Sequence, residues 1–317
     1  MTKRAANQSS AGRFVRYPRI HQLAFNFAQQ GWRGSSYVWW VARRLKSAKS
    51  GRNTRLPSGF VLKVNERDWI SKTVYEGTYE RALLKFLRTL DLEEIVIDIG
   101  ANIGVTLWYS LAHNSARTTF IAFEPSRGCQ EALELVCAEL LAKGKLNFFA
   151  VGGTNGILPL HGVGNQSHSG SASLLWHSGL SGKEIQVEVR TLDSVLGSDL
   201  KGRISLLKID TEGYESEVVN GATSTLESQQ VDIIVMEVSP NFGSIKYLTD
   251  LEETLGGEYI WFQLGESGIV KRSPILKTIS CSEALTFTSQ WNLVLMRKEV
   301  FARYKKKDGA IGIQAVA

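Results

Sequence analysis

A short apolar run followed by an acid and glycines lies between residues 95 and 104. Residues 95–97 are β-branched, which is typical of a buried strand, and a segment with helical spacing begins at Val105. The polar and glycine positions between these two segments are Asp98, Gly100, Asn102 and Gly104. A strand, a tight glycine turn and a helix start form a place where backbone N–H groups approach a ligand closely. These four residues are therefore predicted to hold a nucleotide-like cofactor.

Two further residues narrow the choice of cofactor. Asn102 stands where a dinucleotide fold has its second glycine, and a side chain there would crowd a pyrophosphate. Glu124 ends a second apolar run, in the position from which an acid typically binds ribose hydroxyls. The turn carries no phosphate-binding Lys or Arg, which favours a cationic nucleoside without phosphate, S-adenosylmethionine. Backbone at Val151, which ends a third apolar run, is the predicted contact for the adenine.

A second group of acids follows the run at residues 204–209. Methyl transfer to a hydroxyl needs a group that takes the proton, and Asp210 is the first candidate, with Glu212 the second. Glu215 is expected to cap the helix that follows. Asp210 and Glu237 suggest two oxygen ligands for Mg²⁺ or Ca²⁺, but the sequence supplies no third ligand, so a divalent metal is possible and not favoured.

The segment between residues 152 and 188 is rich in glycine, serine and histidine, and it interrupts the alternation of predicted strands and helices. We expect it to be a long loop that works as a lid over the ligand. His168 in this segment is a third candidate for the catalytic base, because histidine titrates near neutral pH. The histidine spacing has no zinc signature.

The elements around these residues alternate between strands and helices. Strands are expected at 60–64, 95–98, 120–124, 146–151, 204–209, 231–236, 259–264 and 292–296, and helices at 80–90, 105–113, 126–141 and 215–226. Such alternation predicts a parallel, doubly wound α/β sheet with helices on both faces.

Taken together, these segments resemble the FkbM family of S-adenosylmethionine-dependent methyltransferases, from about Leu56 to about Pro240. The strongest match is the segment Leu207–Glu215, joined by 77–80, 96–104, 122–125 and 191–193. The resemblance implies a Rossmann-like fold with a seven-stranded, mostly parallel sheet, an antiparallel last strand, and usually O-methylation of a hydroxyl. Family members commonly carry an acid near the adenine amino group, where this chain has Gly153.

Charge is distributed unevenly along the 317 residues. Twelve of the 37 basic residues and none of the 31 acidic ones lie in residues 1–55. We therefore divide the chain into a basic, partly helical N-terminal extension (1–55), a methyltransferase domain (56–300) and a C-terminal tail (301–317). The extension is interpreted as a cap on the domain, as a peripheral contact with an anionic membrane or substrate, or as a targeting segment. No specific nucleic-acid motif is present.

Three functions remain open at this stage. The first is methylation of a hydroxyl on a sugar, glycolipid or secondary metabolite. The second is a nucleotide-linked oxidoreductase on the same fold, and the third is an inactive cofactor-binding module. Three cysteines without metal or redox spacing and the lack of a long apolar run predict a cytoplasmic protein.

Overall fold

A computed structural model describes most of the chain after residue 52. The described residues are 15–16, 23, 53–65, 67–114, 116–140, 143–164, 170–176, 180, 182–197, 202–228, 230–242, 245–267, 273–306 and 312–314. The expected helical extension therefore lies almost wholly outside the described residues, as do His168 and His177.

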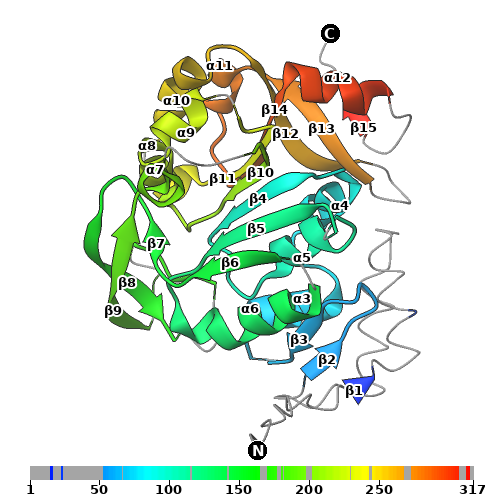
Figure 1. The fold of residues 1–317 in the computed structure, drawn as a ribbon, viewed down its shortest axis with the longest axis vertical. Helices are drawn as coiled ribbons and strands as arrows, with labels where there is room; N and C mark the ends of the chain where they lie inside the picture. The colour runs from blue at the N-terminus through cyan, green and yellow to red at the C-terminus, as the bar shows by residue number, and fades with distance from the viewer. Residues whose placement is uncertain are drawn as a thin grey trace, which may run out of the picture.

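The centre of the molecule is a large mixed sheet (Figure 1). Its order is β15-β13-β12-β14-β11-β10-β4-β5-β6, and the strands β4, β5, β6, β10 and β11 are mutually parallel. The strand β14 is antiparallel to both β11 and β12. The bounds are β4 Glu94–Ile99, β5 Thr118–Phe123, β6 Lys143–Asn147, β10 Ile204–Ile209, β11 Ile233–Val238, β12 Tyr259–Ser267, β13 Ser273–Ile279, β14 Trp291–Arg297 and β15 Gly312–Gln314. The predicted mostly parallel α/β sheet, with its antiparallel strand near the end of the chain, is confirmed.

Helices cover both faces of this sheet and bury two separate cores. One core joins the sheet to α3 (Trp69–Glu76), α4 (Arg81–Thr89), α5 (Val105–Leu111), α6 (Arg127–Leu140) and α12 (Lys298–Lys306). The other joins it to α7 (Leu192–Leu196), α8 (Glu215–Asn220), α9 (Thr223–Glu227), α10 (Tyr247–Leu255) and α11 (Cys281–Ala284). Successive residues of β4 supply opposite faces, Val96 to the first core and Ile97 to the second. Burial on both faces explains why the sequence runs of these strands are apolar without alternation.

Several element predictions need correction. The third strand begins at Lys143, and Ala150–Val151 form a separate strand, β7. The expected loop at 152–188 is largely a hairpin of β8 (Gly156–Val163) and β9 (Lys183–Arg190), which builds a small sheet with β7. The helix expected at 215–226 is split into α8 and α9, and β13 and β15 extend the expected seven strands.

Residues before the domain and at its start together form a second small sheet. The hairpin of β2 (Asn53–Arg55) and β3 (Val61–Lys63) confirms the expected strand there, and β1 (Val15–Arg16) pairs with β2 in parallel. At the other end, α12 packs on β14 and β12, and β15 pairs with β13. The division of the chain at residues 55 and 300 stays a prediction, although these two elements bring part of the expected tail onto the sheet.

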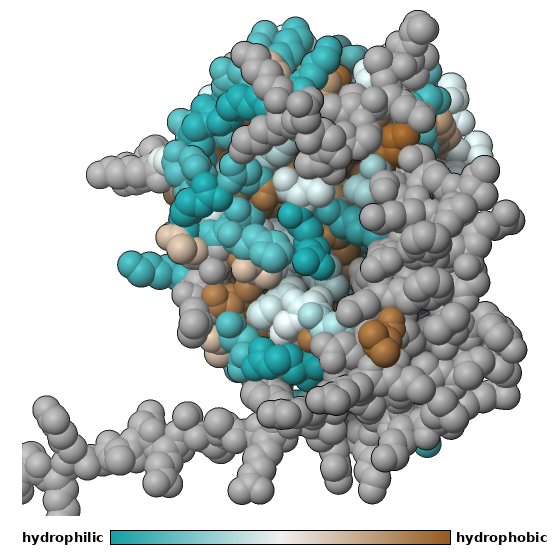
Figure 2. All heavy atoms as spheres, turned by 90° about the vertical axis from the view of Figure 1, so that its right-hand side faces the viewer, coloured by the Kyte–Doolittle hydropathy of each residue, from teal (hydrophilic) through white to brown (hydrophobic). Residues whose placement is uncertain are grey.

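No helix in the described part of the chain is both long enough and apolar enough to cross a membrane. On the face seen in Figure 2, hydrophilic side chains prevail over the described surface and the hydrophobic ones form separate small patches.

Candidate active site

A cleft opens at the carboxyl ends of β4, β5 and β10. This is the edge at which open α/β sheets bind ligands. Predicted site residues that line the cleft are Gly100, Asn102, Glu124, Val151, Asp210 and Glu212. The fold thus brings residues from four distant segments to one cavity.

The glycine turn lies against the end of β10. Gly100 has φ +77°, and a Cβ added to it would lie 1.8 Å from the carbonyl oxygen of Asp210. A larger residue cannot occupy this position unless the two strand ends separate. Asn102 also adopts a left-handed conformation, with φ +50°, and its side-chain Oδ1 accepts from its neighbour's backbone N–H at 2.7 Å.

Glu124 is buried at the tip of β5 and is tied to the turn. Its Oε2 accepts from the backbone N–H of Asn102 at 2.9 Å, and its Oε1 accepts from the N–H of Ser126 at 2.7 Å. Burial raises the pKa of Glu124 to about 7, although these two hydrogen bonds favour the ionised form. Each carboxylate oxygen has a second lone pair, so the group can still accept hydrogen bonds from a ligand.

Val151 in β7 lines the same cleft beside Leu160 and Tyr214. The next two residues are glycines. A Cβ on Gly152 would lie 2.8 Å from the Tyr214 ring, and one on Gly153 would lie 2.5 Å from a carboxylate oxygen of Glu217. Only Gly152 is required by packing, because the Glu217 carboxylate beside Gly153 is the end of a flexible side chain.

Asp98 and Gly104 are not among the lining residues of the cleft. Asp98 is buried behind the turn, where it accepts from the Thr106 hydroxyl at 2.9 Å. Gly104 caps α5 with φ +82°, and a Cβ there would press on Leu133 and Val136 at 3.0 Å. Their predicted contact with the cofactor stays a prediction, and the structure places both as supports of the turn.

The acids after β10 line the same cleft beside the glycine turn. Asp210 Oδ2 lies 3.2 Å from the Nζ of Lys208, and the backbone N–H of Asp210 donates to the carbonyl of Ile99. Glu212 is held in a left-handed conformation, with φ +55°, and its carbonyl accepts from the Ser173 hydroxyl at 2.8 Å. Burial and the nearby Asp210 raise the pKa of Glu212 to about 8.

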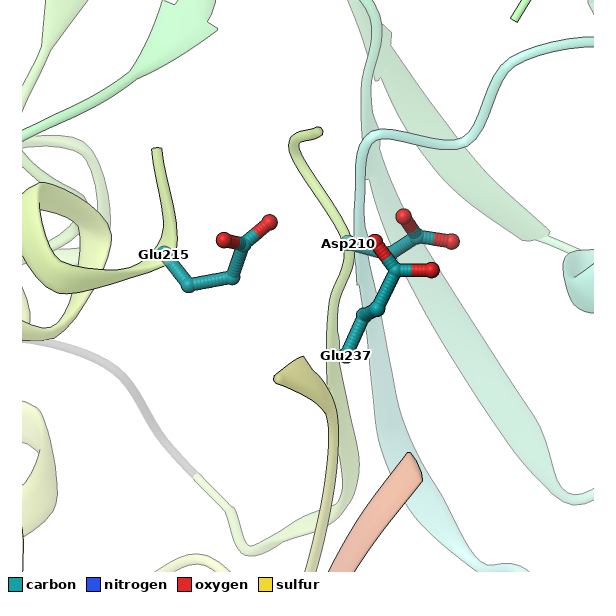
Figure 3. A group of neighbouring side chains, drawn as sticks. All are labelled: Asp210, Glu215 and Glu237. Carbon is teal, nitrogen blue, oxygen red and sulfur yellow. The ribbon is translucent and has the colours of Figure 1, made fainter. Parts of the chain in front are cut away.

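Glu215 and Glu237 lie near Asp210 (Figure 3). Glu215 Oε1 accepts from the backbone N–H groups of Thr211 and Gly213 and from the Thr211 hydroxyl, at 2.8–3.1 Å. These contacts agree with the structural role expected for it. Glu237 accepts from Ser239 and Gln290, and burial followed by the charge of Asp210 raises its pKa to about 9.

Asp210, Glu215 and Glu237 each offer an oxygen within 4.8 Å of the others, and Figure 3 shows Glu215 pointing from α8 toward the other two. The structure thus supplies a third carboxylate that the sequence did not reveal. Three oxygens at this spacing have the chemistry to hold a hard divalent cation. The preference for metal-free chemistry stays a prediction.

The histidine predictions fall elsewhere. His168 lies outside the described residues. His161 belongs to β8, not to a loop, and its Nδ1 lies 3.3 Å from the carboxylate of Glu184. Gly170, Ala172 and Leu174 line the cleft, and the expected lid function of this segment stays a prediction.

Tyr79 and Glu80 were not predicted as site residues. Tyr79 lines the cleft, and burial followed by the charge of Asp210 raises its pKa. Glu80 has φ +35°, and its carboxylate accepts from Asn292 at 3.2 Å. Burial and Asp210 raise the pKa of Glu80 as well. Both residues lie in the segment 77–80, which resembles the family, but the sequence suggested no role for either side chain.

Comparison with known proteins supplies the family. Among solved structures, the chain is similar to precorrin-6y C5,15-methyltransferase from Geobacter metallireducens, at 11% identity and a TM-score of 0.35, over 69% of this chain and 89% of that one. It is similar at the same identity and TM-score to a protein described as an RNA methyltransferase from Pyrococcus horikoshii, over 70% of this chain and 83% of that one. No curated protein matches the chain.

A family model described as the methyltransferase FkbM domain matches residues 98–259. This span contains the glycine turn, Glu124 and the acids after β10, and it covers just over half of the chain. The family implies the use of S-adenosylmethionine. The chain belongs to the FkbM methyltransferase family.

Proposed function

We propose that the protein transfers a methyl group from S-adenosylmethionine to a hydroxyl of a sugar, a glycolipid or a secondary metabolite. Membership of the family supports methyltransferase activity, and the choice of a hydroxyl as the methyl acceptor is our proposal. The observation that supports it most is the shared cleft, which both the Gly100 turn and Asp210 line.

The residues of the Gly100 turn, together with Glu124 and Val151, fit the methyl donor. The Gly100 turn leaves backbone exposed to the cleft because no side chain fits there, and Glu124 keeps lone pairs for hydroxyls at the tip of β5. Gly100, Asn102, Glu124 and Val151 would hold the donor, which supplies a methyl group on a sulfonium. Positioning of donor and acceptor is the larger part of such catalysis, worth roughly 7–11 kcal/mol in well-oriented reactions.

Asp210 would accept the proton of the acceptor hydroxyl. As the oxygen–carbon bond forms, the carbon–sulfur bond breaks and its electron pair stays on sulfur, while the hydroxyl proton passes to the Asp210 carboxylate. The products are the methyl ether and S-adenosylhomocysteine. Lys208, 3.2 Å away, provides the counter-charge for the ionised carboxylate.

The surrounding acids favour a neutral, hydroxyl-rich acceptor. Glu212 lines the cleft, and with a pKa of about 8 it keeps its proton at pH 7, so it can donate one hydrogen bond and accept others. A polyol needs both donors and acceptors, whereas a cationic amine would need ionised carboxylates.

Two measurements test the proposal. S-Adenosylhomocysteine should bind in a calorimetric titration and NAD should not; the reverse result would favour the oxidoreductase. Radiolabelled methyl groups should then pass to glycan, lipid or small-metabolite fractions of an extract.

The matched control is Asp210→Asn, which should bind S-adenosylhomocysteine like the wild type and transfer no label. Label in protein or nucleic acid alone would overturn the acceptor class, and none in any fraction would favour the inactive module.

A further inference from the structure

Tyr79 is a side chain of the cleft that has no part in the proton transfer to Asp210. It belongs to the short segment between α3 and α4, and it lines the cleft together with Ile70 of α3. Within the described part of the chain, the Tyr79 hydroxyl has no hydrogen-bond partner. A tyrosine hydroxyl that is largely removed from solvent normally has one. The hydrogen bonds of this hydroxyl are therefore available to a molecule in the cleft.

The position of the Tyr79 ring is fixed without the help of its hydroxyl. The backbone N–H of Tyr79 donates to the carbonyl oxygen of Thr73 at 3.2 Å, just after Gly77 ends α3 with φ +68°. The ring meets the ring of Trp69 edge to face, with 6.0 Å between their centroids. Since neither contact uses the hydroxyl oxygen, the fold does not explain why this residue is tyrosine instead of phenylalanine.

The charges around Tyr79 place it on the acceptor side of the cleft. Burial raises its pKa, and so do the nearby acids, in the order Asp210, Glu80, Glu212 and Glu237. Asp210, the first of these acids, is the proposed proton acceptor. The phenol stays protonated beside this acidic group, so it can donate one hydrogen bond and accept another.

We propose that Tyr79 binds the methyl acceptor and that this acceptor is a sugar ring. The inference rests on the proposed function of the cleft and selects one of its acceptor classes. A pyranose has an apolar face of C–H groups and an edge of neighbouring hydroxyls. Tyr79 supplies an aromatic ring and a hydroxyl, and Trp69, which is 46% exposed, extends the aromatic surface beside it. Glu212 lines the same cleft and supplies a second group that can donate and accept.

The test measures sugar binding to the full chain, with and without saturating S-adenosylhomocysteine. The probes are methyl pyranosides of glucose, galactose, mannose and rhamnose, with octyl glucoside to represent a lipid-linked sugar and cyclohexanol to represent a lone hydroxyl. Saturation-transfer NMR with irradiation of the protein's aromatic protons reports C–H groups that lie on aromatic rings. In the wild type at least one glycoside should give saturable signals on its ring C–H protons, and cyclohexanol should bind more weakly.

Two variants separate the hydroxyl of Tyr79 from its ring. Tyr79→Phe should keep the pattern of C–H signals and raise the dissociation constant of the glycoside about three- to tenfold, because one hydrogen bond is lost. Tyr79→Leu should weaken binding further and reduce the transfer from aromatic protons. S-Adenosylhomocysteine should bind to both variants as it does to the wild type.

The matched control is Tyr304→Phe, because the Tyr304 hydroxyl has a partner in the fold. It accepts from the backbone N–H of Asp91 at 2.7 Å, and Tyr304 is not a lining residue of the cleft. This variant should have a lower melting temperature and the glycoside affinity of the wild type. Tyr79→Phe should show the reverse, with weaker glycoside binding and no fall in melting temperature.

Several results would overturn the inference. Glycoside binding that is equal in Tyr79→Phe and the wild type would do so, and a lower melting temperature in that variant would then assign the hydroxyl to the fold. Weaker S-adenosylhomocysteine binding in Tyr79→Phe would assign it to the methyl donor. No glycoside signal in the wild type, or equally tight binding of cyclohexanol, would exclude a sugar acceptor but leave hydroxyl methylation standing. Failure of the wild type to bind S-adenosylhomocysteine would instead overturn the proposed function, while sugar binding measured without it would still be informative about Tyr79.

Discussion

Replacing Glu124 with glutamine should change how the stability of the protein depends on pH. In the wild type, burial raises the pKa of Glu124 from 4.5 to about 7. Between these values the folded state binds a proton that the unfolded chain has released, so unfolding releases protons. The contribution of Glu124 to stability is therefore fully present below pH 4.5 and is lost as the pH rises through 7.

The size of the effect follows from the shift. A displacement of about 2.5 pH units corresponds to about 3 kcal/mol of unfolding free energy at 1.36 kcal/mol per unit. Glutamine does not titrate, so the variant lacks this component. Its amide also leaves one backbone N–H, of Asn102 or Ser126, without an acceptor, but this cost is independent of pH.

The assay is urea unfolding of both proteins at several pH values between 4.5 and 8.5. Between pH 4.5 and 8.5 the unfolding free energy of the wild type should fall by about 3 kcal/mol relative to that of the variant. An additional pH-independent difference in unfolding free energy between the two proteins does not affect this comparison. A flat difference would refute the argument that burial perturbs Glu124. Binding gives an independent check. A hydrogen bond to a charged group contributes about 1.5–3 kcal/mol, so its loss at the ribose should weaken S-adenosylhomocysteine binding by about 10- to 150-fold at pH 8.

Two further predictions concern the turn and the N-terminal segment. Gly100→Ala should lower the unfolding free energy by more than about 3 kcal/mol, because the added Cβ would overlap the Asp210 carbonyl and the residue has a left-handed φ. The control is Gly156→Ala, where no atom lies within 4 Å of the added Cβ. This variant should change the unfolding free energy by less than about 0.5 kcal/mol. Equal melting temperatures for the two variants would contradict the packing argument. The full chain should float with phosphatidylserine vesicles at low salt and a chain without residues 1–55 should not, since that segment contains twelve basic residues and no acidic one. Equal flotation of both proteins would reject a membrane contact through this segment.

The core strands were predictable because their signals are local. The runs that form β4 and β10 are apolar without alternation, since each strand is covered by helices on both faces. Glycines and acids directly after such runs must lie at the carboxyl edge of a parallel sheet. This rule is sufficient to predict that Gly100, Glu124 and Asp210 share one cleft, and all three line it.

The hairpin of β8 and β9 was missed for a different reason. Its sequence contains many glycines, serines and histidines, which are typical of loops. Residues 184–189 nevertheless alternate in burial, with Val187 and Val189 buried between exposed neighbours. This period of two was visible in the sequence and was outweighed by the composition of the surrounding segment.

Tyr79 and Glu80 could not be placed from the sequence. They precede α4, and the position of α4 depends on how it packs against β12 and β13, strands that come almost two hundred residues later. Local patterns carry no information about such a contact. The same holds for Glu215, whose distance from Glu237 depends on the packing of α8 against β11.

The buried acids link the stability of the fold to the chemistry of the cleft. Burial is the largest cause of the raised pKa values of Glu80, Glu124, Glu212 and Glu237. Each of these groups makes the fold less stable as the pH rises, so a sequence selected for stability alone would place apolar side chains there. Protonated carboxyls supply hydrogen-bond donors that apolar side chains cannot. Strongly perturbed acids in a cleft are typical of functional sites, so the cluster is better explained by a role in the chemistry of the cleft than by folding, in line with the hydroxyl acceptor proposed above.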